Sequence, residues 1–248
     1  DSGNEFESLR QYMYGDETSR IDWKATARRS ELIVKNYEIQ RQQSVIAAID
    51  LGRATAGRFR GYSRLDYLVD AALKLAYVTL RQKDWFSLIA FDSDIRAYLP
   101  PVHGLKNIEK AARVLHNLES RPIESDYARA FRFLSQNNRK RSLLCLMTDV
   151  IDETASSVII AYMSRLARYH LPLAVTLINT EIRKCASEPL ADTEDIYTKA
   201  IALDTLAARK KALISMRRRG VSVLDTAPDD LNTELINRYT YIKTRHML

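Results

Sequence analysis

Short apolar runs alternate with amphipathic segments along most of the chain. Five such runs cover residues 44–51, 85–91, 142–148, 171–178 and 221–224. Apolar runs of this length, bounded by turn residues, are typical of strands that are buried on both faces of a parallel sheet.

The segments between these runs have apolar residues at helical spacing. Ser63 and Asp66 form a capping pattern before a helix whose apolar stripe continues to Leu80. The other predicted elements are helices over 105–118 and 154–169, a long helix ending at 217–219, a helix starting at Asp229, and an edge strand over 95–99 that ends at Pro100 and Pro101. The alternation predicts an α/β fold with a mostly parallel sheet and helices on both of its faces.

The first 43 residues have a different pattern. A turn at Gly15-Asp16 separates short apolar stretches, and charges of alternating sign surround it. We predict an N-terminal extended arm over 1–43, followed by one α/β domain over 44–248. The arm is expected to pack Tyr12 and Trp23 on the domain, and a partner-binding arm is the alternative.

The composition and charge of the chain indicate a globular domain without a nucleic acid partner. The chain has 248 residues, of which 46% are hydrophobic and 28% charged, which is typical of a globular domain. The net charge is +7, but the basic clusters at 139–141, 209–211 and 217–219 lie apart and are not interleaved with aromatic residues. We interpret them as solvated helix ends, with a surface facing anionic lipid as the second interpretation, and expect no nucleic acid partner. Cys145 and Cys185 are predicted to be free thiols in a reducing compartment.

Acidic residues follow two of the apolar runs. Asp50 ends the first run and Asp149 follows the run at 142–148. Because ligands bind beyond the carboxyl ends of strands in open α/β sheets, both aspartates are expected at a cation or partner site.

Motifs for catalysis do not occur. The four histidines are scattered, and His170 is interpreted as a residue that interacts with a helix dipole. The sequence has seven glycines and no phosphate-binding loop, nucleophile elbow or dinucleotide motif. We therefore expect no enzyme, and a divalent-cation-dependent hydrolase that uses the acidic loops stays as an alternative.

The residues resemble one known family. The likeness runs through Leu9-Arg10-x-Tyr12-x-x-Gly15-Asp16, Arg20-Ile21-Asp22-Trp23, Ala27-Arg28, Asp50-x-Gly52-Arg53, Glu124-Ser125-Asp126-Tyr127, Thr148-Asp149, His170-Leu171-Pro172-Leu173 and Tyr241-Ile242-Lys243-x-Arg245. These motifs are similar to those of the bacterial domain-of-unknown-function family fifty-eight, whose members resemble von Willebrand factor A domains, a Rossmann-like fold. The arm signature consists of Arg10, Tyr12, Asp16, Arg20, Asp22, Trp23 and Arg28.

The resemblance implies a location and a partner. Family members commonly carry membrane helices upstream of this segment, which implies a domain at the cytoplasmic side of the inner membrane. They are often encoded beside MoxR-type AAA+ ATPases, so the resemblance implies an adaptor or interaction role with such an ATPase. No enzymatic activity is established for the family.

The resemblance also implies a degenerate metal site. A von Willebrand A-type adhesion site binds Mg²⁺ through an Asp-x-Ser-x-Ser loop, a threonine and a second aspartate. Asp50 and Asp149 match the two aspartates, whereas Gly52 and Ala54 stand at the serine positions and Ser125 or Asp126 in the region of the threonine. No cofactor is expected, and an Mg²⁺-dependent adhesion-type binding domain stays as an alternative.

A positive side chain can replace the missing cation. Our hypothesis is that Arg53 is a built-in counter-ion for the clustered carboxylates, because charge-assisted hydrogen bonds are strong. The predicted binding surface for a partner comprises Asp50, Gly52, Arg53, Ser125, Asp126 and Asp149.

Overall fold

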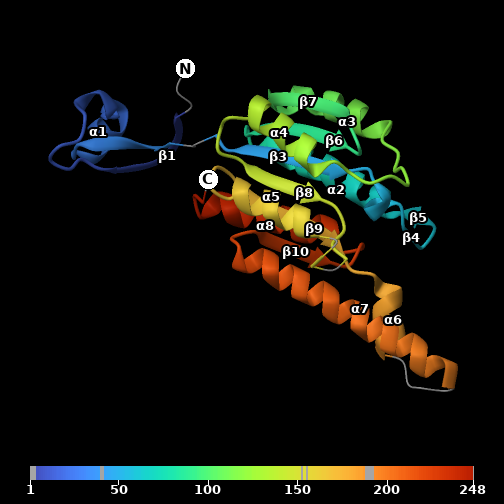
Figure 1. Cartoon of the computed structure of the whole chain (residues 1–248). Coiled ribbons are helices and arrows are strands. Elements are labelled where there is room, and N and C mark those ends of the chain that lie inside the picture. The colour runs from blue at the N-terminus through green and yellow to red at the C-terminus, as the bar shows by residue number, and fades with distance from the viewer. Residues whose placement is uncertain (1–3, 40–41, 152, 155, 188–192, 248) are drawn as a thin grey trace. The chain divides into compact units, whose positions relative to one another are not determined.

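The computed structural model describes residues 4–39, 42–151, 153–154, 156–187 and 193–247. The chain divides into two compact units, Asp1–Gln42 and Gln43–Leu248 (Figure 1). The division falls one residue before the boundary that the sequence predicts.

The first unit is a small folded element of its own. Strands β1 (Asn4–Gln11) and β2 (Ile33–Ile39) pair antiparallel, and the turn η1 (Thr18–Arg20) and helix α1 (Trp23–Arg29) lie between them in sequence. The prediction of an extended arm was therefore wrong, because local hydrogen bonds fold this segment. Backbone pairing between β1 and β2 satisfies groups that an extended arm would leave to water.

Several signature residues hold this unit together. Arg10 makes a bidentate ion pair with Asp16, at 2.6 and 2.7 Å, and Asp16 also accepts a hydrogen bond from the Met13 amide. Asp22 caps α1 by accepting from the amides of its first turn. The Tyr12 amide donates to the Leu32 carbonyl oxygen. Trp23 is 68% exposed, Arg28 is also exposed, and the side chain of Arg20 lies outside the description. The packing of Tyr12 and Trp23 on the domain stays a prediction.

The second unit is built on a six-stranded sheet with the order β10-β9-β8-β3-β6-β7. All neighbouring pairs are parallel except β6 and β7. The strands are β3 (Ser44–Asp50), β6 (Trp85–Phe91), β7 (Ile95–His103), β8 (Leu143–Met147), β9 (Leu171–Leu177) and β10 (Ser222–Thr226). The predicted α/β fold with a mostly parallel sheet is confirmed.

Helices cover both faces of this sheet (Figure 1). One face packs against α2 (Arg64–Arg81), α3 (Ile108–His116) and α8 (Leu231–Thr244), and the other against α4 (Tyr127–Asn137), α5 (Ser157–Leu166) and α7 (Thr193–Arg218). The short helix α6 (Thr180–Ser187) packs on α7. The remaining elements are η2 (Arg53–Thr55), η3 (Leu105–Asn107) and the two-residue strands β4 (Arg58–Phe59) and β5 (Tyr62–Ser63).

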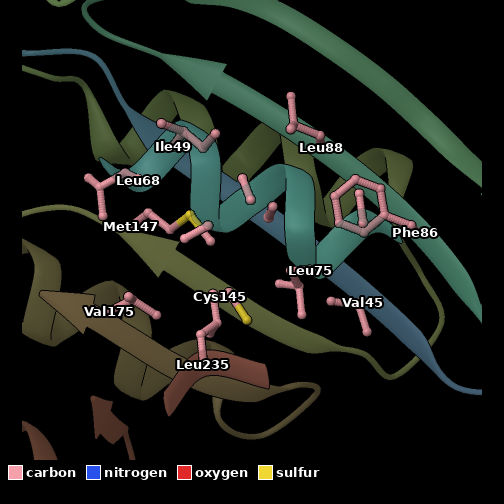
Figure 2. Packing of buried hydrophobic residues seen from close by; sticks show 14 of the residues in the cluster. Val45, Ile49, Leu68, Leu75, Phe86, Leu88, Cys145, Met147, Val175 and Leu235 are labelled. Atoms are coloured by element: carbon pink, nitrogen blue, oxygen red, sulfur yellow. The ribbon is translucent and has the colours of Figure 1, made fainter. Parts of the chain in front are cut away.

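The core follows the alternation of side chains along β3. Val45 and Ile49 point to the cluster with Leu68, Leu75 and Leu235 (Figure 2), whereas Ile46 and Ala48 belong to the opposite cluster. Cys145 lies in the first cluster as a free, fully buried thiol, and burial raises its pKa to about 12. Both cysteines are free thiols, as the sequence predicts, and that of Cys185 is only partly buried.

Several predicted boundaries differ from the structure, and the helix predicted to start at Asp229 begins at Leu231. Strand β7 continues through Pro100 and Pro101 to His103, because an edge strand leaves one side of its backbone unpaired and tolerates proline there. The helix predicted over 105–118 begins with the turn η3 and becomes α-helical only at Ile108. Helix α5 is shorter at both ends than predicted. Among the described residues, no helix combines the length and apolar character needed to cross a membrane.

Candidate functional site

The Asp50 carboxylate is fully buried at the carboxyl end of β3. Its Oδ1 accepts from the Gly52 amide, at 2.8 Å, and from the Ser125 hydroxyl. Its Oδ2 accepts from the hydroxyls of Thr148, at 2.5 Å, and Tyr127. Four neutral donors of the chain therefore hydrogen-bond to this buried carboxylate, as a buried charge requires.

The Tyr127 hydroxyl remains a donor at this site. Tyr127 is the first residue of α4, and its hydroxyl lies 3.0 Å from Thr148 Oγ1 as well as beside Asp50. Burial and the charge of Asp50 raise the pKa of Tyr127 far above its usual value, so the phenol stays protonated.

Gly52 has no room for a side chain. A Cβ atom built at this position would lie 2.2 Å from the Ser125 Oγ and 2.8 Å from the Ile123 carbonyl oxygen. The Ser125 hydroxyl thus occupies the space that a serine side chain at 52 would need. Packing against Ser125 and Ile123 therefore excludes a serine at position 52. Ser125, from another loop, supplies a hydroxyl to Asp50 instead.

Asp149 is neutralised by two arginines. The side chain of Asp149 is 11% exposed. Its Oδ2 accepts a hydrogen bond from Arg64 Nη1, and its Oδ1 accepts one from Arg209 Nη1 at 2.6 Å. Arg64 is the first residue of α2 and also donates to the Leu177 carbonyl oxygen. The charge that compensates Asp149 therefore comes from two helices that are distant in sequence.

Arg209 extends this network to a second acid. Its Nη2 donates to Asp225 Oδ1 at 2.8 Å, to the Thr176 hydroxyl and to the Leu177 carbonyl oxygen. Burial opposes the charge of Arg209, but Asp149 and Asp225 outweigh it and raise the pKa of the guanidinium. Breaking one partner of such a buried network is costly, because the remaining charges lose their compensation.

Other predicted site residues lie elsewhere. The hypothesis that Arg53 is the counter-ion was wrong, because its guanidinium pairs with Glu124 at 2.5 Å and both side chains are largely exposed. Asp126 caps α4 by accepting from the Arg129 amide at 2.9 Å. Of the two residues considered for the threonine position, Ser125 is the one that contacts Asp50.

A fourth acid of the same sheet edge is also paired. Asp92 follows β6 and is buried, and Arg96 Nε lies 2.6 Å from its Oδ2. Burial disfavours the charged form, but Arg96, the Asp94 amide and Arg121 together lower the pKa of Asp92.

A cavity of about 720 Å³ lies above these groups. Its lining includes Asp50 and Asp149, the exposed pair Arg53 and Glu124, and the α7 residues Leu206, Arg209, Lys210, Leu213 and Arg217. The spacing of these α7 residues puts them on one face of the helix. The cavity is of the size that proteins use to bind ligands or a protruding partner side chain.

An adhesion-type metal ion does not fit these residues. Both oxygens of Asp50 already accept hydrogen bonds, both oxygens of Asp149 contact arginines, and position 52 cannot hold a serine. Mg²⁺ needs several oxygen ligands in octahedral geometry. Among the residues that the structure describes, no group of three His, Cys, Asp or Glu side chains could hold a metal.

Sequence reasoning missed five residues of this site: Arg64, Tyr127, Thr148, Arg209 and Asp225. Thr148 and Tyr127 adjoin predicted positions, so the neighbouring hydroxyls were the available signal. Arg209 lies within the long helix α7 and its side chain is 13% exposed, so the interpretation of residues 209–211 as a solvated helix end was wrong.

A comparison with family models identifies one match. The model described as protein of unknown function DUF58 matches residues 8–184. No curated protein matches the chain.

Solved structures show the same fold at low sequence identity. An aerotolerance-related membrane protein from Bacteroides fragilis aligns with a TM-score of 0.52 and 14% identity, over 82% of this chain and 99% of that one. The PilB minor pilin from Streptococcus sanguinis aligns with a TM-score of 0.52 and 10% identity, over 86% of this chain, which spans 64% of the pilin chain. The SpRpn10 VWA domain aligns with a TM-score of 0.46 and 9% identity, over 79% of this chain and 95% of that one. The two alignments with TM-scores above 0.5 show that the chain shares its α/β fold with these proteins.

Proposed function

Because the chain belongs to the DUF58 family of proteins of unknown function, with a von Willebrand factor A-like fold, we propose that it is a non-enzymatic protein-interaction domain. It binds a partner protein through the loops at the carboxyl ends of its strands, and it does so without a metal ion. The partner we propose is a MoxR-type AAA+ ATPase.

The neutralised acids carry this proposal. Four donors surround Asp50, and two arginines compensate Asp149, so neither carboxylate is left to bind a cation. The pocket that gives adhesion-type domains their metal is here a rigid base for the loops around it. A surface held by such a base is suited to binding and lacks an activated nucleophile or base for catalysis.

The exposed part of this edge offers the contacts. Arg53 is 63% exposed and Glu124 is 72% exposed, and they form a charged pair at the rim of the cavity. Ile151 also lines the cavity, and its side chain is about half exposed. An apolar side chain surrounded by charged groups is the usual composition of a transient protein interface.

The location follows from the same family likeness. We propose that a membrane segment elsewhere in the natural protein holds this domain at the cytoplasmic side of the inner membrane. The structural likeness to a membrane protein from Bacteroides fragilis supports a membrane context.

Charge reversal at the rim tests the proposal. We expect Arg53→Glu to reduce co-purification with the MoxR-type ATPase at least fivefold, with unfolding unchanged, because an exposed ion pair adds little stability. The double variant Arg53→Glu with Glu124→Lys should recover part of the binding if the pair itself is recognised.

Arg60→Glu is the matched control. Arg60 forms an exposed pair with Asp229 at 3.0 Å and does not line the cavity. Asp149 is unsuitable for this test, because its loss leaves Arg64 and Arg209 without their acid. Equal co-purification of the Arg53 variant, the control and the wild type would contradict the assignment of the surface.

A further inference from the structure

A second cavity lies between α4 and α5, near the amino ends of β8 and β9. Its lining includes Asn138, shortly before β8, and His170, directly before β9. The cavity has a volume of about 530 Å³, within the range of small-molecule sites. We call it the α4–α5 cleft. It is separate from the candidate site, which lies at the carboxyl ends of the strands.

Three arginines line the α4–α5 cleft without acidic partners. They are Arg132 of α4, Arg139 after it and Arg165 of α5. No Asp or Glu occurs among the described residues that line the cleft, and none of the three arginines forms an ion pair within the described part of the chain. Clustered guanidinium groups repel one another, and an anion that accepts their hydrogen bonds removes this repulsion.

Two buried polar side chains in the cleft have an atom without a partner. Asn138 and His170 are each 5% exposed, and no group of the described chain hydrogen-bonds to Asn138 Oδ1 or His170 Nδ1. Asn138 Nδ2 donates to Ser87 Oγ at 2.9 Å, which leaves Oδ1 as the free acceptor. An ordered water or a ligand group usually completes a buried acceptor of this kind.

His170 is a neutral group at this position. Burial, and then the charge of Arg141, lower the pKa of its imidazole. His170 does follow α5, as the sequence predicts, and its amide donates to the Leu166 carbonyl oxygen. A neutral imidazole can donate or accept through Nδ1, so it can hydrogen-bond to either kind of ligand atom.

Aromatic rings form the remaining wall. Phe131 and Tyr162 lie with ring centroids 5.8 Å apart and an interplanar angle of 34°. Tyr169 also lines the cleft and is 67% exposed. Aromatic faces beside cationic groups are suited to a molecule that combines a flat, neutral ring with a separate anionic group, since planar bases stack on such faces.

We propose that the α4–α5 cleft binds a nucleotide. Its phosphate contacts Arg132, Arg139 and Arg165, and its base packs against Tyr162 or Tyr169. The hydroxyl and amino groups of the nucleotide face Asn138 and His170. This inference does not depend on the proposed protein partner, because it concerns another edge of the sheet and other side chains.

Calorimetric titration of AMP and GMP into the whole chain tests this proposal. We expect saturable binding of at least one of them, weakened about tenfold or more by Arg165→Gln, because a charge-assisted hydrogen bond to phosphate is lost. Arg168→Gln is the matched control, since Arg168 is an exposed arginine near the same helix end that does not line the cleft. The Arg168→Gln variant should bind the nucleotide with the affinity of the wild type. Arg165 is exposed, so its variant should remain folded, which circular dichroism can check.

Two further probes distinguish the sources of phosphate. Inorganic phosphate should bind at least tenfold more weakly than the nucleotide, because it lacks the ring and the donor groups. Vesicles of phosphatidylglycerol should compete with the nucleotide only weakly. The proposal is overturned if neither nucleotide binds, if phosphate binds equally well, if vesicles alone bind through these arginines, or if Arg165→Gln and Arg168→Gln behave alike.

Discussion

The two edges of the sheet satisfy their polar groups in opposite ways. At the carboxyl edge, Asp50, Asp92, Asp149 and Asp225 all accept hydrogen bonds or ion pairs from the same chain. In the α4–α5 cleft, three arginines lack acidic partners within the described structure, and buried atoms of Asn138 and His170 lack hydrogen bonds. The comparison indicates that the chain itself compensates the acids of the carboxyl edge, and we propose that a ligand completes the cleft.

The largest effect is expected at the centre of the carboxyl edge. Arg209→Gln leaves Asp149 and Asp225 without their shared cation, so the free energy of unfolding should fall by about 3–5 kcal/mol. Urea denaturation measures this change. Arg218→Gln, an exposed arginine on the same helix, should change it by less than about 0.5 kcal/mol. Equal effects of the two substitutions would show that the network does not stabilise the edge.

A smaller loss is expected when one donor to Asp50 is removed. Tyr127→Phe leaves the buried carboxylate with one donor fewer, which should cost about 1–3 kcal/mol. The exposed residue Tyr197 provides the control, because Tyr197→Phe removes a hydroxyl without a buried partner of this kind. A Tyr127 variant as stable as the wild type would mean that Asp50 does not depend on the phenol.

The smallest effect is expected on the pH dependence of stability, through His170 in the α4–α5 cleft. The pKa of His170 is lowered in the folded state, so below the unfolded pKa of about 6.5 the unfolded chain binds the extra proton more readily. Lowering the pH from 7.5 to 5.5 should therefore cost the wild type up to about 1 kcal/mol through this residue. His170→Gln should remove this component, whereas His116→Gln at an exposed position should retain it. The same pH slope in both variants would contradict the account of His170.

Much of the fold could be predicted from the sequence. Fully buried strands are continuous apolar runs, and Ser63 with Asp66 forms the capping box that the pattern predicts at the start of α2. The first 43 residues were predicted less well, because Arg10 and Asp16 fold a local turn that ordinary periodicity does not reveal. Helix α1 is short, and its existence depends on the Asp22 cap.

The candidate site was predicted only in part. Asp50 and Asp149 could be located because parallel strands end at one edge of the sheet. Their partners could not, because Arg64 lies 85 residues from Asp149 and Arg209 lies 60 residues from it. Arg53 is adjacent in sequence and was the natural choice as counter-ion, but its position on η2 directs it to Glu124.

Titration of Mg²⁺ into the wild-type chain and into Asp50→Ala is the most direct test of the claim that the carboxyl edge is neutralised by the chain itself. Isothermal calorimetry at neutral pH should show no saturable binding to either protein, because donors of the chain already contact the oxygens of Asp50 and Asp149. Tight binding to the wild type that disappears in Asp50→Ala would contradict this account.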